Sequence, residues 1–578
     1  MGKEFFNADM EMYIDHRVDW PRYFRLRRRE PVHAAEEVET FKTVLRSVGE
    51  ICADIETGAI DHWHEEVQVI DGAVVTPPHI AAGYQKLRGA GLVCLPLGPE
   101  YNGYGLPILL NCAYLEMVAR ADSSLMTIVG LQTGVAGDIE KYGSDELKQR
   151  YLPRFASGEL QGSMDLTEPQ AGSDLGGIVT RATDENGRYF LDGEKIFITN
   201  GGADIHLVLA RDARLYDRTK GTTNGLSLLL CPVVLPDGTR NRVTVARAEK
   251  KLGIHGSPTC VVQFDHAEAF LLGRAGGGFR AMLDLMNNAR LGVAAQAIGV
   301  ADAAYRQARE YTMQRVQFDA PIIEQPLVKS MLTLMAINIH AARALLYRTC
   351  SLIDMAEALR VYLASARGKA DPERATLQAE LEQTGQLIRF FTPLCKYYAT
   401  EISNDVTRKG IQLHGGIGYM AESPAGHYHS DSIITTIYEG TSEIQASFAL
   451  KEMGKGALFA TLDSLRAELE PLRPAYPDLV ALVCDAIDRW IHPSMPALMG
   501  DPQYALLNAK RVCEMVIDVV VAAELLMQSG LSDEKRDLAA SFIHRHMLAV
   551  EMNARRISSG DASRIKRYDR IIGLSQEG

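Results

Sequence analysis

The stretch that decides the fold reads Tyr438-Glu439-Gly440-Thr441-Ser442-Glu443-Ile444-Gln445, and it follows a glycine-rich segment, Gln412-Leu413-His414-Gly415-Gly416-Ile417-Gly418-Tyr419. The glycine cluster alone is a weak sign of a nucleotide site, because it lacks the preceding strand of a dinucleotide fingerprint. Glu439 alone could be a helix-start carboxylate, which the helix dipole favours, since the pattern from Thr441 to Ala449 is helical. The meaning of both segments therefore depends on the rest of the chain.

Three upstream segments are considered with them, and the first two contain residue types that suit a polar cofactor. The first is a turn of small and hydroxylated residues, Met164-Asp165-Leu166-Thr167-Glu168-Pro169-Gln170-Ala171-Gly172-Ser173-Asp174. The second is a strand end followed by glycines that let a flat ring approach the backbone, Lys195-Ile196-Phe197-Ile198-Thr199-Asn200-Gly201-Gly202. The third is Arg315-Val316-Gln317-Phe318. Taken alone, the first two are also typical of an ordinary loop and strand.

The spacing of apolar residues divides the chain into four regions. Helical spacing predicts an N-terminal helical domain over 1–162, although the first 40 residues show no usable motif. Short strands between close turns predict a central antiparallel β-domain over 163–272, a barrel or sandwich rather than a parallel Rossmann sheet. Long helical stretches predict a C-terminal helical bundle over 273–452, with a loop or helix break at 366–373, and an additional helical C-terminal domain over 453–578. The predicted fold class is α+β.

The composition argues against several classes of protein. Of the 578 residues, 47% are hydrophobic, and a net charge of −12 argues against nucleic-acid binding. The basic run Arg25 to Arg29 is more simply a solvated helix face. Nine cysteines without CxxC spacing favour reduced thiols and a cytoplasmic address, and His414, His427 and His429 lack a ligand pattern, so no metal is assigned. The segment from Met1 lacks an export or lipidation signal, and the chain has no apolar run of about 20 residues, so integral membrane association is not expected.

Taken in order, the five segments resemble the acyl-CoA dehydrogenase family over roughly residues 80 to 450. The resemblance implies a helical domain, a central β-domain and a helical bundle, with FAD lying between domains and across a subunit interface. Three features look closest to the branch that contains 3-methylmercaptopropionyl-CoA dehydrogenase: the additional C-terminal domain, the segment Lys251 to Cys260, and the 366–373 insertion. Branch membership does not fix the acyl group of the substrate.

The resemblance also implies a role for each matching residue. Glu439 would be the catalytic base, and Ser173, Arg290 and Gly440 would contact the substrate, with Ser173 near its phosphate or thioester arm. Thr199 would lie near flavin N5. The other cofactor-binding residues would be Leu166 and Thr167 at the pyrimidine edge, Phe197 and Ile198 on the strand, Arg315, Gln317, Gln412 and Gly416 from the neighbouring subunit, and Thr441 and Glu443 at the adenosine.

The implied reaction forms a trans-2-enoyl-CoA by α-proton abstraction and β-hydride transfer to the flavin. A buried carboxylate suits the weakly acidic α-proton because burial raises its basicity. The resemblance implies an acyl-CoA substrate and an electron-transfer flavoprotein as acceptor. A homodimer is expected because the additional C-terminal domain would occupy the space that a second dimer uses in tetrameric relatives. Two alternatives remain: an acyl-CoA oxidase that uses oxygen, and an inactive acyl-CoA-binding scaffold.

The sequence departs from the family pattern near the base. Many relatives have an arginine before Asp431 and a basic residue two places after it, where this chain has Ser430 and Ile433. Phe197 stands where a tryptophan is common, and Gln325-Pro326 replaces a histidine or aromatic residue followed by glutamine. Some branches place the base on another helix and have glycine at the position of Glu439. The presence of a glutamate here therefore favours this position for the base.

Overall fold

The computed structural model describes residues 4–27 and 33–574. Its contacts divide the chain into two compact units: the first comprises residues up to Leu332 together with Ile402–Glu439, and the second comprises Thr333–Glu401 and the chain from Gly440 onward. In the basic run, Arg25 and Arg27 belong to the second helix, while Arg28 and Arg29 lie outside the described residues, as do Met1, Gly2 and Lys3.

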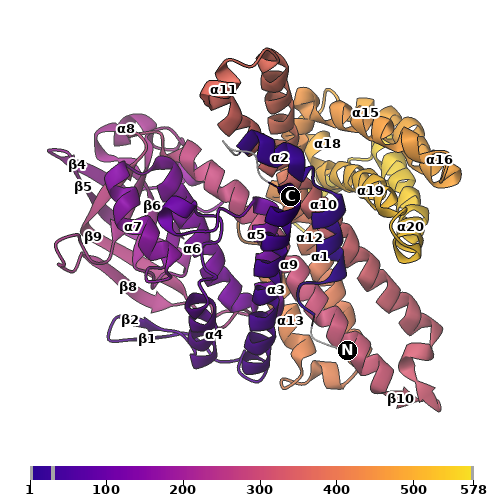
Figure 1. Ribbon diagram of the computed structural model, residues 1–578, viewed down its shortest axis with the longest axis horizontal. Helices are drawn as coiled ribbons and strands as arrows, with labels where there is room; N and C mark the ends of the chain where they lie inside the picture. Colours follow the sequence, from indigo (N-terminus) through magenta and orange to yellow (C-terminus); the bar gives the residue numbers. More distant parts are fainter. Residues whose placement is uncertain (1–3, 28–32, 575–578) are drawn as a thin grey trace. The chain divides into compact units, whose positions relative to one another are not determined.

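The N-terminal part of the first unit is helical, as predicted (Figure 1). Side chains cap several of these helices; Asp122 accepts a hydrogen bond from the backbone N–H of Leu125, for example. The prediction missed a small hairpin, β1 (Gln68–Ile70) and β2 (Ala73–Val75), whose Asp71-Gly72 turn has two positive φ angles. The helices are α1 (Ala8–His16), α2 (Trp20–Arg27), α3 (Ala34–Ala59), α4 (Pro78–Gly89), α5 (Ile108–Ala121), α6 (Ser123–Tyr142) and α7 (Asp145–Ala156).

The central region forms a β-barrel, which confirms the predicted β-domain. The pairings β4–β5, β5–β9, β9–β7, β7–β6 and β6–β4 close into a ring, while β3 adds to β6 and β8 adds to β9. Most pairings are antiparallel, but β3 and β4 run parallel to β6. The strands are β3 (Gly162–Asp165), β4 (Arg181–Glu185), β5 (Arg188–Thr199), β6 (Ile205–Asp212), β7 (Leu226–Pro232), β8 (Val243–Ala248) and β9 (Thr259–Leu272), and a short helix, α8 (Tyr216–Thr219), lies between β6 and β7.

Strands β6 and β7 are buried on both faces, which explains their continuous apolar runs. Val208, Ala210 and Leu229 belong to the core inside the barrel. The alternate residues Leu207 and Leu228 belong to a second core that includes residues of α6 and α7. The barrel is therefore packed directly against the N-terminal helices.

Long helices follow the barrel, as predicted. Helix α9 (Gly278–Gln314) packs against α5 and α6. The predicted break at 366–373 is present, because one long helix ends at Ala364 and the next begins at Arg374. The further elements here are β10 (Val316–Gln317), β11 (Ala320–Pro321), α10 (Pro326–Ala364), α11 (Ala366–Lys369), α12 (Arg374–His414), α13 (Pro424–Ile433) and α14 (Ser442–Glu452).

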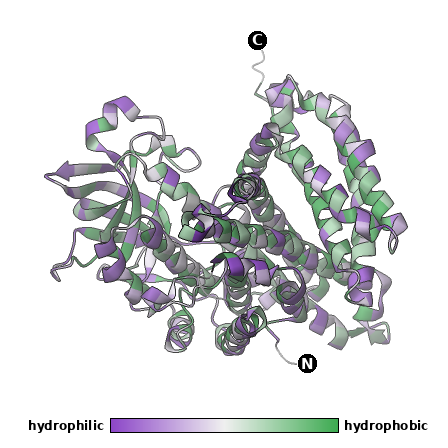
Figure 2. Ribbon diagram, turned by 45° about the horizontal axis from the view of Figure 1, so that its top comes forward, coloured by the Kyte–Doolittle hydropathy of each residue, from purple (hydrophilic) through white to green (hydrophobic). Residues whose placement is uncertain are grey.

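The additional C-terminal region is helical and belongs to the second unit. A partly buried ion-pair cluster helps to hold it: Arg348 contacts Glu468 at 2.7 Å and Glu524 at 3.1 Å. Most helices of the chain carry both hydrophilic and hydrophobic residues (Figure 2). The helices are α15 (Leu458–Leu469), α16 (Pro477–Asp485), α17 (His492–Ser494), α18 (Pro502–Leu507), α19 (Ala509–Gln528), α20 (Asp533–Ser558), α21 (Ser563–Lys566) and α22 (Tyr568–Ile571).

Candidate active site

The predicted cofactor loop lies directly beside the end of β5. The carbonyl of Thr167 accepts a hydrogen bond from the backbone N–H of Ile196 at 2.9 Å, and Lys195 Nζ donates to the carbonyl of Leu166 at 2.8 Å. The register of β5 shifts between Lys195 and Ile198, so the strand bulges where Phe197 lies, with φ 58°. The bulge leaves Phe197 61% exposed. The structure thus brings together Leu166, Thr167, Phe197, Ile198 and Thr199.

A buried ion pair fixes this loop. Lys195 Nζ lies 2.8 Å from Glu168 Oε1, and both side chains are almost completely excluded from solvent. Glu168 also accepts hydrogen bonds from the backbone N–H groups of Val179 and Thr180. Burial alone would raise the pKa of Glu168, but Lys195 and these donors hold that pKa below its usual value. At the tip of the loop, Ser173 is exposed.

Glu439 has an unusual backbone conformation. Its φ is 56°, in the left-handed region, and the next residue, Gly440, has φ 91°. A non-glycine residue in this region costs about 1–3 kcal/mol, and such strain persists only where the surrounding structure enforces it. The carbonyl of Gly440 accepts hydrogen bonds from Lys396 Nζ at 2.7 Å and Gln445 Nε2 at 3.0 Å. The helical pattern predicted from Thr441 onward is confirmed, because the Thr441 side chain caps the N-terminus of α14.

A buried arginine lies near Glu439. Arg290, on α9, is 4% exposed and donates from Nη1 to Asn287 at 2.9 Å. Burial lowers the pKa of Arg290, while the negative charge of Glu439 acts in the opposite direction and favours the charged guanidinium. The structure therefore brings the predicted base and the predicted substrate-side arginine into one electrostatic environment.

Two side chains anchor the segment that leads to Glu439, and neither anchoring role was predicted from the sequence. Asp431, on α13, accepts a hydrogen bond from the backbone N–H of Ile254 at 2.5 Å. The Tyr438 hydroxyl donates to Gln296 Oε1 on α9. A polar residue inside the apolar run from Leu291 to Ile298 was a signal that could have indicated Gln296.

The remaining predicted cofactor-binding residues are distant in the sequence from the loop at Leu166 and the strand end at Thr199. Most of them are exposed to solvent. Arg315 and Gln317 are exposed at the end of α9 and in β10, and Gln412 and Gly416 are exposed at the end of α12. The rings of Tyr311 and His414 stack with centroids 4.5 Å apart, so the ends of α9 and α12 lie together. In the second unit, Glu443 is exposed and its carboxylate contacts Lys510 Nζ at 2.7 Å.

The three histidines considered as ligands have other partners. His414 Nδ1 lies 2.7 Å from the carbonyl of Gly410, and His429 Nδ1 lies 3.0 Å from the hydroxyl of Thr407. His427 stacks on Trp63, with Nε2 3.2 Å from Asp431. Over residues 4–27 and 33–574, no group of three His, Cys, Asp or Glu side chains could hold a metal ion.

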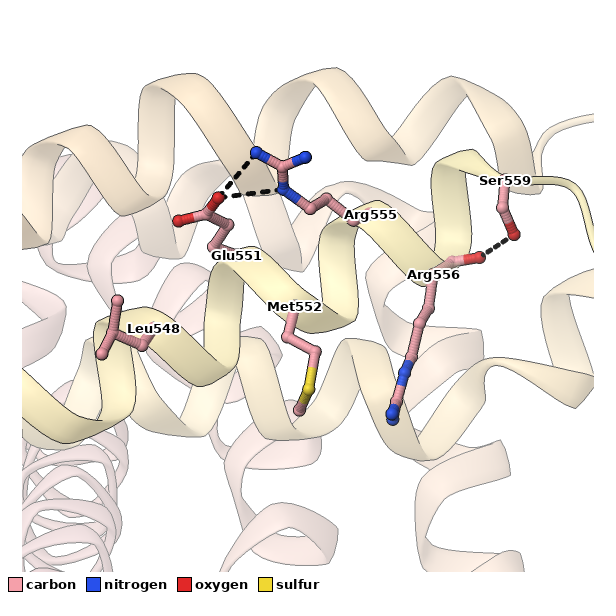
Figure 3. A pocket seen from close by; sticks show the side chains of 6 residues that line it. All are labelled: Leu548, Glu551, Met552, Arg555, Arg556 and Ser559. Atoms are coloured by element: carbon pink, nitrogen blue, oxygen red, sulfur yellow. Dashed lines mark hydrogen bonds and ion pairs between the residues drawn. The ribbon is translucent and has the colours of Figure 1, made fainter.

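A concave surface lies on α20 and is open to solvent. It contains one acid–base pair, Glu551 with Arg555, and exposed apolar side chains (Figure 3). It contains none of the predicted cofactor or substrate residues. Its lining residues are Leu548, Glu551, Met552, Arg555, Arg556 and Ser559. Within the described part of the chain, no helix is long and apolar enough to cross a membrane.

Family models match most of the chain. The N-terminal, middle and C-terminal domains of acyl-CoA dehydrogenase match residues 54–159, 163–267, and 276–370 with 358–454. The chain therefore belongs to the acyl-CoA dehydrogenase family of oxidoreductases. It is 33% identical to 3-methylmercaptopropionyl-CoA dehydrogenase of Ruegeria pomeroyi over 460 residues, which are 76% of this chain and 74% of that protein. The resemblance stated from the sequence is confirmed.

Solved structures agree with this assignment. Butyryl-CoA dehydrogenase from Megasphaera elsdenii is 27% identical, with a TM-score of 0.59, over 71% of this chain and 98% of that chain. Acyl-CoA dehydrogenase from Bacillus anthracis, complexed with FAD, has a TM-score of 0.71 and covers 92% of each chain. At 23% identity this second likeness supports the fold alone, and it extends over most of the C-terminal helices.

Proposed function

We propose that this protein is an FAD-dependent acyl-CoA dehydrogenase that forms trans-2-enoyl-CoA, with Glu439 as the base that removes the α-proton. The observation that carries the proposal is the strained backbone of Glu439, whose charge also acts on the buried Arg290. Strain of this kind persists at functional sites, where a fixed side-chain direction is worth its energetic cost. A glutamate that only began a helix would not need φ 56°, because helix-start residues have ordinary backbone angles.

The residues at the end of β5 suit the isoalloxazine ring of a flavin. The bulge at Phe197 exposes an aromatic face, and Thr167 and Thr199 supply hydroxyl groups next to backbone N–H and C=O groups. We assign Leu166, Thr167, Phe197, Ile198 and Thr199 to this ring. The bound flavin would supply the two-electron acceptor for the β-hydride.

The protein's own residues would handle the proton and the thioester. The α-proton moves to the carboxylate of Glu439 as the Cα–Cβ bond becomes a double bond, and the β-hydrogen leaves as hydride. The backbone N–H of Glu439 is the donor that the family uses for the thioester oxygen. Gly440, Arg290 and Ser173 would line the path of the substrate, with Ser173 nearest the phosphates or the thioester arm.

A second subunit would complete the cofactor site. Seven of the exposed apolar residues of the first unit lie between residues 313 and 327 or between 417 and 420, and they are called the exposed apolar surface: Met313, Val316, Phe318, Leu327, Ile417, Tyr419 and Met420. Phe318 is 87% exposed and Tyr419 is 84% exposed, which is unusual for large apolar side chains and typical of an interface. Arg315, Gln317, Gln412 and Gly416 stand among these residues, so we propose a homodimer in which they contact FAD of the partner. Thr441 and Glu443 would lie against the adenosine portion of FAD.

The proposed electron acceptor is an electron-transfer flavoprotein, and the acyl group of the substrate stays unassigned. An oxidase that uses oxygen is the alternative on the same fold, and fast reoxidation of the anaerobically reduced protein in air would favour it. An inactive scaffold would instead bind acyl-CoA without any loss of flavin absorbance. The cytoplasmic address remains a prediction, supported by nine free cysteines that are buried except for Cys484.

Replacing the base tests the proposal directly. Wild type, Glu439→Gln and Glu534→Gln would be titrated anaerobically with a panel of acyl-CoA thioesters while flavin absorbance is recorded. We expect bleaching by one class of thioester in wild type and in Glu534→Gln, whose exposed glutamate on α20 is the matched control. Glu439→Gln should bleach at least about 10³-fold more slowly, because no other residue is assigned to the proton. Equal bleaching in Glu439→Gln and wild type would remove Glu439 from the mechanism.

A further inference from the structure

A buried chain of hydrogen bonds ends on the residue next to Glu439. The Tyr438 hydroxyl donates to Gln296 Oε1, and Gln296 Nε2 donates to Ser123 Oγ at 2.9 Å. Gln296 is completely buried and Ser123 is 5% exposed. The chain links three elements of the first unit: the first turn of α6, the middle of α9 and the segment that follows α13.

The direction of each hydrogen bond is fixed by chemistry. The carboxamide oxygen of Gln296 can only accept, so the proton on this bond comes from Tyr438, and the amide nitrogen must donate to Ser123. Burial raises the pKa of the Tyr438 phenol well above its usual value, and the nearby charge of Glu439 acts in the same direction. The phenol therefore stays protonated and remains a donor throughout the working pH range.

We propose that Gln296 is a positioning residue: through Tyr438, it holds Glu439 in its left-handed backbone conformation. This inference rests on the proposed role of Glu439 as the base. A residue with φ 56° relaxes unless its neighbours are fixed, and Tyr438 immediately precedes it. The side chain of Gln296 reaches Tyr438 from α9, a helix of 37 residues packed against α5 and α6, so the anchor is itself rigid. A second anchor, Asp431 with Ile254, fixes the other end of the same segment.

Loss of the anchor should affect the proton-transfer step more than substrate binding. A displacement of about 1 Å in a reacting group can slow a reaction by about 10²-fold. We therefore expect Gln296→Met and Tyr438→Phe each to slow the limiting rate of anaerobic flavin reduction by about 10–100-fold. The dissociation constant of the acyl-CoA should change much less, and the kinetic isotope effect with α-deuterated substrate should rise as proton abstraction limits the rate.

A double-mutant cycle separates this role from a general packing effect. If the two side chains act through one hydrogen bond, Tyr438→Phe/Gln296→Met should be no slower than the slower single variant. Gln307→Met is the matched control, because it makes the same change on the same helix at a carboxamide oxygen without a hydrogen-bond partner. That variant should reduce at the wild-type rate.

Several outcomes would overturn the proposal. Wild-type rates in both single variants would do so, as would rate losses that multiply in the double variant. If Gln296→Met fails to fold, Tyr438→Phe and Ser123→Ala each still remove one group from the chain of hydrogen bonds. Their rates of flavin reduction can then be compared with wild type in the same way. Glu439→Gln, measured in parallel, separates the positioning role of Gln296 from the role of Glu439 as the base. Slow flavin reduction in Glu439→Gln, together with fast reduction in Gln296→Met and Tyr438→Phe, would contradict the positioning role alone. Fast reduction in Glu439→Gln would contradict the base itself.

Discussion

At the scale of single residues, the segment before the base depends on one buried carboxyl group. Asp431 is 1% exposed, and burial raises its pKa to about 7, although the N–H of Ile254 and the nearby His255 and Lys251 act in the opposite direction. Across pH 4 to 7 the folded protein therefore holds a proton that the unfolded chain has released. The contribution of Asp431 to the free energy of unfolding therefore falls as pH rises through this window, because at this site the folded state binds more protons than the unfolded state.

The fall of this stability contribution with rising pH leads to a prediction for Asp431→Asn. The variant keeps an acceptor for Ile254 but cannot titrate, so its unfolding free energy should fall less between pH 5 and pH 8 than that of wild type. The expected difference is on the order of 1–3 kcal/mol, since one pKa unit corresponds to about 1.4 kcal/mol. Urea midpoints at each pH would measure it. Asp122, whose burial raises its pKa to about 6, titrates in both proteins, but the variant lacks the charge of Asp431 that contributes to this raised pKa. Parallel curves would show that Asp431 is not protonated in the folded protein.

At the scale of elements, the contact that builds the proposed flavin site is between the Leu166–Thr167 loop and strand β5. The sequence could predict that the Leu166–Thr167 turn and the Phe197–Thr199 strand both belong to the site, but only by resemblance. It could not predict that the Lys195 side chain is buried against Glu168, because a strand lysine is ordinarily exposed and its partner lies in a separate loop of the chain. Likewise Gln296 looked like a single polar residue in an apolar helix, and its partners are distant in the sequence.

Removing Lys195 should destabilise the barrel strongly. Lys195→Met leaves Glu168 charged and buried, together with the carbonyls of Leu166 and Leu209, so we expect unfolding to become easier by about 3–5 kcal/mol. Denaturant unfolding followed by fluorescence would measure this, and gel filtration would show whether flavin is retained. Arg188→Met is the control on the same strand, because its pair with Glu268 is largely exposed on the arginine side and should contribute at most about 1 kcal/mol. A Lys195 variant as stable as this control would contradict the argument.

At the scale of the whole molecule, the sequence predicted the order of regions: helices, barrel, helices and additional C-terminal helices. That order follows from local periodicity, which each segment carries in itself. The two compact units do not follow from periodicity, because Ile402–Glu439 belongs with the first unit although chain segments of the second unit flank it on both sides. The helices α1 and α2 fall within the predicted helical domain, but no motif in the first 40 residues indicated that Trp20, Tyr23 and Phe24 would be buried there, since two short helices give little periodic signal.

The exposed apolar surface leads to a prediction about assembly. Phe318→Asp should raise the dimer dissociation constant at least about 10-fold, because the variant would bury a charge in place of an aromatic residue, and the few residues that dominate an interface contribute about 2 kcal/mol or more each. Light scattering over a dilution series would measure the mass of each protein. Val234→Asp, at a 54% exposed apolar residue in the loop between β7 and β8, should keep the wild-type mass. A tetrameric wild type, or a Phe318 variant with unchanged assembly, would contradict the proposed homodimer.

The backbone angle of Glu439 also bears on how this position evolves. Glycine fits φ 56° without strain, and a glutamate codon becomes a glycine codon by one nucleotide change. Once a carboxylate elsewhere can remove the proton, that change relieves strain and is favoured by selection for stability. The reverse change restores the strain before it restores any catalytic benefit. Migration of the base away from this position should therefore be easier than its return, and glycine is the residue that such a lineage should leave behind.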